Sequence, residues 1–106
     1  MDPRTNDQFT QFLREKAAEA QAAIRYHPAR FLGMLGEEGG FSTVNKLLAA
    51  NTVSDGFTKL FMGGRLDLSI EALVVETKWR SYFDPDLVIK AEKKLHQSNY
   101  RFKSDQ

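Results

Sequence analysis

Apolar residues recur at helical spacing along most of the chain, and turn-forming residues interrupt them at short intervals. Near the N-terminus, Thr5 and Gln8 form a capping-box pattern ahead of an alanine-rich stretch with high helix propensity. The apolar positions up to Ile24 keep a spacing of three or four residues, which predicts one long amphipathic helix. Because its apolar stripe narrows to alanine, another helix of this chain or of a second copy is expected to approach it closely.

Three short helices are predicted next, each with its own start and stop signals. Pro28 suits the first turn of one helix, and the glycines between residues 36 and 40 end it. Ser42 and Ser54 are the expected N-caps of two further helices, and Gly63-Gly64 closes the second of them. Short joints between short helices mean that consecutive helices must turn back on one another.

The segment 70–77, IEALVVET, is open to two interpretations. Its short run of β-branched residues fits a buried strand. A helix is favoured because Ser69 is a good N-cap, Glu71 complements the helix dipole, and Leu68 and Leu73 match a hydrophobic staple. A single strand would also have no partner elsewhere in the chain.

A last helix is predicted to begin at Asp84-Pro85-Asp86 and to end on basic residues before a polar tail at 98–106. Tyr100 and Phe102 are the only apolar anchors in this tail, which we expect to be partly disordered or weakly docked. The whole chain is therefore expected to be one all-α domain, a compact bundle of about six helices with its core within residues 5–97.

Composition narrows the classes of function. A length of 106 residues is typical of one domain, and the absence of cysteine excludes disulfides, thiolate nucleophiles and cysteine-bound metal sites. No apolar run is long enough to cross a bilayer, and the N-terminus has no apolar stretch of the signal-peptide type. These features predict a cytoplasmic protein with no membrane partner.

The net charge is only +1, but basic residues gather towards the C-terminus. The stretch 90–103 holds five basic residues and one acidic residue, and Trp79 and Tyr82 alternate with basic residues just before it. A solvated helix end explains much of this pattern, and nucleic-acid binding is the alternative. The residues that would contact nucleic acid are Lys78, Arg80, Lys90, Lys93, Lys94, Arg101 and Lys103.

Residues suited to catalysis or metal binding are few. His27 and His96 are far apart and lack metal-ligand spacing, and the serines are explained as helix caps, so no metal, cofactor or catalytic residue is expected. Arg65, Asp67 and Glu71 form the one polar group of interest. We interpret them as a salt bridge that fixes the turn before the fifth helix, with an enzymatic role as a weaker alternative.

The order of motifs between Tyr26 and about Leu95 resembles that of a family of small bacterial α-helical domains of uncharacterised function. The residues that carry the resemblance are Tyr26-His27-Pro28, Phe31, Met34-Leu35, Gly39-Gly40, Lys46-Leu47-Leu48, Ser54, Gly56-Phe57, Leu60, Gly64-Arg65-Leu66-Asp67-Leu68-Ser69, Glu71-Ala72-Leu73-Val74, Trp79 and Phe83. Most are apolar or turn residues, so the resemblance implies a helical fold that occurs alone or joined to other domains. It implies no catalytic residues.

The leading hypothesis is a non-enzymatic helical interaction or adaptor protein that self-associates or binds another protein. It rests on the lack of a catalytic constellation and on more large apolar residues than short helices easily bury. The alternative is a nucleic-acid-binding accessory protein of a bacterial defence or mobile-element system. The residues expected to form a partly exposed protein-binding patch are Phe31, Met34, Phe57, Phe61, Met62, Trp79 and Tyr82.

Overall fold

The first element of the fold is a long helix, α1 (Pro3–Ile24), in a computed structural model that describes residues 1–102. Asp2 is its N-cap, because the backbone N–H of Thr5 donates a hydrogen bond of 2.7 Å to Asp2 Oδ1. This bond lowers the pKa of the Asp2 carboxyl. Thr5 therefore lies inside the first turn, and its predicted role as the cap is wrong.

A kinked helix, α2 (Ala29–Ala49), takes the place of the two helices predicted for this region. Gly39 has φ 81° and ψ 171°, so the helix changes direction at the glycine pair where a stop was expected. Ser42 lies beyond the kink, and its hydroxyl donates a hydrogen bond of 2.8 Å to Glu38 Oε1. Ser42 is therefore not the N-cap that the sequence predicted.

Side chains of α1 cap the second half of α2. The backbone N–H of Gly40 donates to Thr10 Oγ1 at 2.8 Å, and that of Phe41 donates to Asn6 Oδ1 at 2.9 Å. These bonds satisfy donors that the kink removes from the helical ladder. A side chain at residue 40 would meet the ring of Phe9 at 2.9 Å, so the glycine also lets the two helices approach closely.

The predicted caps of the next helices are confirmed. Ser54 Oγ accepts the N–H of Phe57 at the start of α3 (Asp55–Met62), and Ser69 caps α4 (Ile70–Val75). A 3₁₀ turn, η1 (Leu66–Leu68), joins them. The strand considered for this segment does not form, and residues 1–102 contain no β-strand.

A second 3₁₀ turn, η2 (Lys78–Tyr82), leads to α5 (Pro85–Gln97), which begins at the predicted cap Asp84. The chain then folds back. The hydroxyl of Tyr100 donates to both carboxylate oxygens of Glu76, at 3.0 and 3.1 Å.

The second expected anchor of the tail, Phe102, stacks on the ring of His96 with a centroid distance of 4.9 Å. Residues 98–102 are thus held by the two predicted anchors. The tail was also expected to be partly disordered or weakly docked, and its last residues, 103–106, lie outside the described residues.

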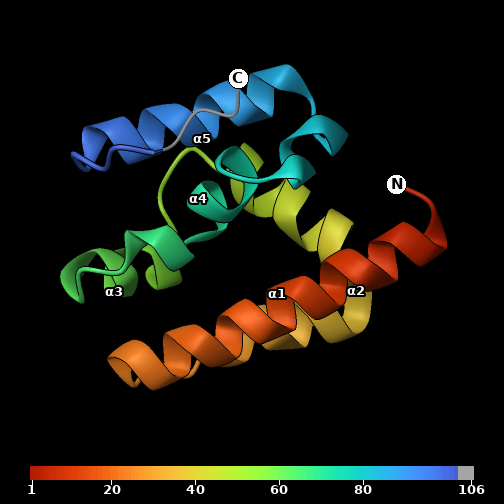
Figure 1. The fold of residues 1–106 in the computed structure, drawn as a ribbon, viewed down its shortest axis with the longest axis horizontal. Helices are drawn as coiled ribbons and strands as arrows, with labels where there is room; N and C mark the ends of the chain where they lie inside the picture. The colour runs from red at the N-terminus through yellow and green to blue at the C-terminus, as the bar shows by residue number, and fades with distance from the viewer. Residues whose placement is uncertain (103–106) are drawn as a thin grey trace.

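The helices enclose one core with α4 at its centre (Figure 1), which confirms the all-α prediction. α1 and the first half of α2 pack together on one side, α5 packs against α4 and α2 on the other, and α3 flanks them. The radius of gyration is 12.7 Å. Among residues 1–102, no helix is both long and apolar enough to span a membrane. The most deeply buried side chains are Phe9, Leu13, Thr43, Val44, Leu48, Ser69, Val74, Val75 and Leu95.

Candidate interaction groove

A groove of about 720 Å³ opens between α1, both halves of α2, α3 and the start of α4. We call it the α1–α3 groove. Three of the residues predicted to bind protein line it: Phe31 and Met34, which are half-buried, and Phe57, which is buried. Sequence segments that are far apart therefore supply neighbouring parts of one apolar surface.

Small side chains on α1 help to leave this space open. Leu13, Ala17 and Ala20 follow one face of α1 and line the groove, as does Leu60 of α3. All four are buried and apolar, so the floor of the groove is apolar too. The alanine stripe expected to admit a close neighbour thus borders a groove.

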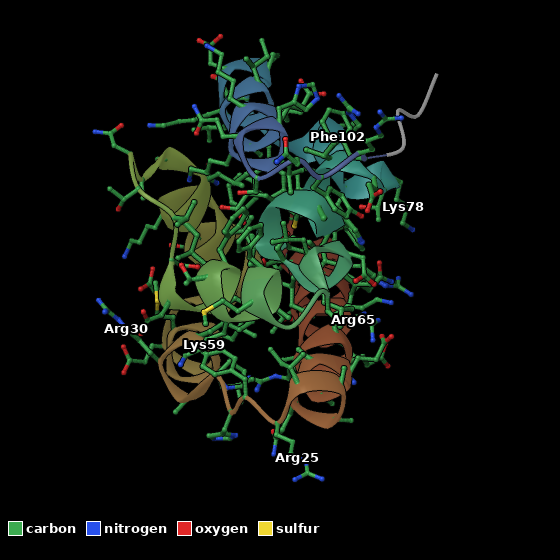
Figure 2. The ribbon with its side chains drawn as sticks, turned by 90° about the vertical axis from the view of Figure 1, so that its left-hand side faces the viewer. Arg25, Arg30, Lys59, Arg65, Lys78 and Phe102 are labelled. Atoms are coloured by element: carbon green, nitrogen blue, oxygen red, sulfur yellow. The ribbon has the colours of Figure 1, made fainter. Side chains whose placement is uncertain are left out.

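The charged side chains of the lining are mostly basic. Lys46 forms an ion pair of 2.7 Å with Glu38, which lowers the pKa of that carboxyl, and Lys16 pairs with Glu19 at 3.0 Å. Arg30 also lines the groove and makes no ion pair within residues 1–102. Figure 2 shows its side chain at the edge of the molecule.

Exposed apolar side chains lie in the groove lining and at the end of α3. Val53 lines the groove and is 42% exposed, while Phe61 and Met62 at the end of α3 are 51% and 77% exposed. Phe61 follows Phe57 by one helical turn and lies on the same side of α3. The apolar surface is therefore larger than the groove itself.

Two predicted patch residues need correction, because Phe57 and Trp79 are only 3% and 6% exposed. Trp79 is a core residue that packs on Phe9, with ring centroids 4.7 Å apart. Tyr82 is exposed as expected but contacts Trp79 and is not part of the groove lining. The predicted patch thus separates into the groove, the core and a surface outside the groove.

The three polar residues that were predicted to act together, Arg65, Asp67 and Glu71, do not form one cluster. The Arg65 guanidinium donates two hydrogen bonds to the Asp67 carboxylate, at 2.9 and 3.0 Å, which lowers the pKa of Asp67 and raises that of Arg65. The predicted salt bridge at this turn is thus present between Arg65 and Asp67. Glu71 does not join it, because its side chain points into the core.

Lys94 is the partner of Glu71, at 3.5 Å, and both side chains are almost completely buried. Lys94 Nζ also donates to the carbonyl of Leu47 at 3.2 Å, so this lysine ties α5 to α4 and α2. Burial raises the pKa of the Glu71 carboxyl, an effect that the attraction of Lys94 opposes. The sequence predicted that Lys94 belongs to an exposed basic surface. That prediction is wrong, because Lys94 is buried.

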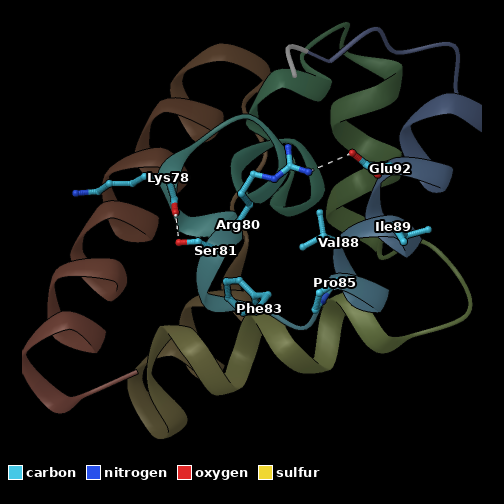
Figure 3. A pocket seen from close by; sticks show the side chains of 8 residues that line it. All are labelled: Lys78, Arg80, Ser81, Phe83, Pro85, Val88, Ile89 and Glu92. Carbon is cyan, nitrogen blue, oxygen red and sulfur yellow. Dashed lines mark hydrogen bonds and ion pairs between the residues drawn. The ribbon is translucent and has the colours of Figure 1, made fainter. Parts of the chain in front are cut away.

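Two other nucleic-acid candidates are held by contacts within the chain. Arg80 donates to the carbonyl of Val75 at 3.0 Å and lies 3.4 Å from Glu92, beside an open groove of about 710 Å³ (Figure 3). Lys90 donates to the carbonyl of Ala49 and to Asn51, at the end of α2.

The remaining nucleic-acid candidates are scattered over the surface. Lys78 extends over the ring of Trp79 at 5.0 Å from its centroid, and Lys93 and Arg101 are exposed. Lys103 lies outside the described residues. No group of three or more potential metal ligands gathers within residues 1–102.

Sequence reasoning missed Val53 and Arg30 as groove residues. Val53 stands next to a predicted cap, and Arg30 stands in a first turn, so local pattern alone marks both as boundary positions. Only the packing of three helices reveals their role. Comparison of the chain with known proteins found no matching family model, no similar curated protein and no similar solved structure.

Proposed function

We propose that this chain is a non-enzymatic interaction domain that holds a segment of another protein in the α1–α3 groove. The supporting observation is that the exposed Val53 lines the apolar groove and that the exposed Phe61 follows the lining residue Phe57 by one turn of α3. A contiguous apolar surface of this kind is typical of protein-binding sites. If the chain self-associates, the second copy would bind to the same surface. We also propose that the protein is cytoplasmic.

The charged groups considered for catalysis have structural partners. Arg65 pairs with Asp67 at the turn before α4, and Glu71 pairs with Lys94 inside the core. The three residues of the enzymatic alternative therefore do not converge on one reacting atom, as a catalytic site requires. This arrangement favours binding over catalysis.

Crosslinking from the groove edge tests the proposal. A photoreactive amino acid in place of Val53 should crosslink a partner protein in the native host, and Phe61→Glu should reduce the yield strongly. Ile89→Glu is the matched control, because Ile89 is 47% exposed and lies on α5, outside the groove. Measurement of the mass in solution distinguishes a second copy from another protein.

The proposal would be wrong if the wild-type chain stays monomeric at high concentration and the photoreactive amino acid at position 53 crosslinks no protein. Equal capture by the Phe61→Glu variant would also overturn it, provided circular dichroism shows that the variant is folded.

Nucleic-acid binding is the alternative proposal. The groove between η2 and α5 supports it, because Lys78 and Arg80 both line that groove. It predicts affinity that falls steeply as the salt concentration rises. Absence of binding to single- and double-stranded DNA and RNA at low salt would dismiss it.

A further inference from the structure

The walls of the α1–α3 groove constrain the conformation of its occupant. They are built from helices and from the segments that join them, and residues 1–102 offer no sheet edge with which an extended segment could pair. A protein segment buried in such a groove must satisfy its own backbone hydrogen bonds. A helix does so within itself, and helix-in-groove binding uses apolar side chains at positions i, i+3, i+4 and i+7.

The apolar floor fits one face of such a helix. Leu13, Ala17 and Ala20 of α1 and Leu60 of α3 all line the groove, and all are buried. Met34 adds a flexible and polarisable side chain, which adapts to the shape of a bound side chain. The occupant therefore needs apolar residues along one side.

The groove lining holds three basic residues, Lys16, Arg30 and Lys46, against one acidic residue. Arg25, Arg30 and Lys59 make no ion pair within residues 1–102. Arg30 lines the groove, whereas Arg25 and Lys59 lie outside the lining, in the same half of the molecule in Figure 2. Asp55 is the only acidic residue among the described residues of the lining, and it occupies the first turn of α3, where it complements the helix dipole.

The start of α2 adds to this positive potential. Pro28 is its N-cap and supplies no side-chain hydrogen bond, so the positive end of the α2 dipole lies uncapped beside Arg30. A partner with carboxylates beside its apolar face would complement Arg30 and its basic neighbours.

Resting on the proposed function, we infer that the α1–α3 groove binds an acidic amphipathic helix of a partner protein. Its apolar side chains occupy the groove, and its glutamate or aspartate side chains pair with Arg30 and with the neighbouring Arg25 and Lys59. Phe61, one turn of α3 beyond Phe57, covers the part of the bound helix that extends beyond the groove.

Two fluorescently labelled synthetic peptides test this inference with the full chain. Both have the same leucine face with helical spacing, and their polar faces carry glutamate in one peptide and lysine in the other. Fluorescence anisotropy should show that the glutamate peptide binds about tenfold or more tightly, a difference of about 1.4 kcal/mol. Raising the salt concentration should reduce this preference.

Arg30→Glu should remove the preference for the glutamate peptide, and Arg30→Gln should reduce it. Both substitutions suit the exposed first turn of α2, so the fold should be kept. Lys93→Glu makes the same change of charge at an exposed position of α5 and should leave both affinities unchanged.

Equal binding of the two peptides, with no effect of Arg30→Glu, would overturn the inference and leave the proposed function standing. The inference would also be wrong if neither peptide binds while the photoreactive amino acid at position 53 still crosslinks a partner in a way that Phe61→Glu reduces. The partner would then be of another kind. Binding of neither peptide and no capture would overturn both.

Discussion

At the level of single residues, Glu71 and Lys94 form an ion pair that is almost completely buried. Each charge loses its hydration on burial, and their mutual attraction only partly offsets that cost. The hydrogen bond from Lys94 to the carbonyl of Leu47 adds a second attachment. The pair thus fixes how α5 sits on α4 and on the end of α2.

Lys94→Met should destabilise the chain by about 3–5 kcal/mol at neutral pH, because it leaves the Glu71 carboxylate buried without its partner. Denaturant unfolding measures this loss, and the double variant Glu71→Gln with Lys94→Met should recover part of it. Burial raises the pKa of Glu71, so the folded variant binds a proton more readily than the unfolded chain. The deficit should therefore grow as the pH rises above about 4.5. A deficit that does not change with pH would contradict this account.

A second prediction concerns Tyr100. Burial and its hydrogen bonds to Glu76 raise the pKa of its hydroxyl from 10.0 to about 12. Between these values the folded chain keeps a proton that the unfolded chain loses. This contribution to stability is complete below pH 10 and is lost as the pH rises towards 12. Absorbance titration should show one phenol ionising near 12, and Tyr100→Phe should lack that step. A wild-type titration with no such step would contradict the prediction.

How well a residue is predicted depends on whether its partner is near in sequence. Ser54, Ser69 and Asp84 cap the helices that follow them immediately, and all three were predicted. Lys94 and Glu71 were assigned to the surface and to the turn, because ordinary helix-end and dipole rules explain them without a tertiary partner. Their true contact joins residues on two helices that only the fold brings together.

At the level of elements, the kink in α2 determines where the groove lies. The first half of α2 packs along α1, and the second half turns towards α4 and α5 at Gly39. The sequence predicted the break from its glycine pair. It could not predict that the helix resumes at once, because Asn6 and Thr10 of α1 provide the cap from 30 or more residues away.

Gly39→Ala should cost about 1–3 kcal/mol, because φ is 81° and the new Cβ would lie 2.8 Å from Asn6 Nδ2. Gly33→Ala is the matched control within the same helix. It has open space around it and should stabilise the chain by about 0.5–1 kcal/mol, because alanine favours the helix. Denaturant unfolding of both variants gives the comparison. Similar effects of the same sign would show that the kink does not need glycine.

At the level of the whole molecule, the two ends of the bundle differ in how they are held. α4 and α5 share a buried ion pair and a wide apolar contact, whereas α3 contacts mainly η1 and α1. All-α architecture and a single core followed from helical periodicity alone. The groove did not, because it depends on how far apart three helices settle, and alanine at positions 17 and 20 is equally compatible with close packing.

Local stability should follow this division. α3 is short, carries the exposed Phe61 and Met62, and forms one wall of the groove, so it should open without global unfolding. Hydrogen exchange should therefore be faster in α3 than in α4 and α5 of the free chain. The glutamate peptide should slow exchange in α3 and at the start of α2 but leave α5 unchanged, because it adds contacts only at the groove. If α3 exchanged only at the global unfolding rate, it would be as firmly held as the core, and the groove would be a rigid site.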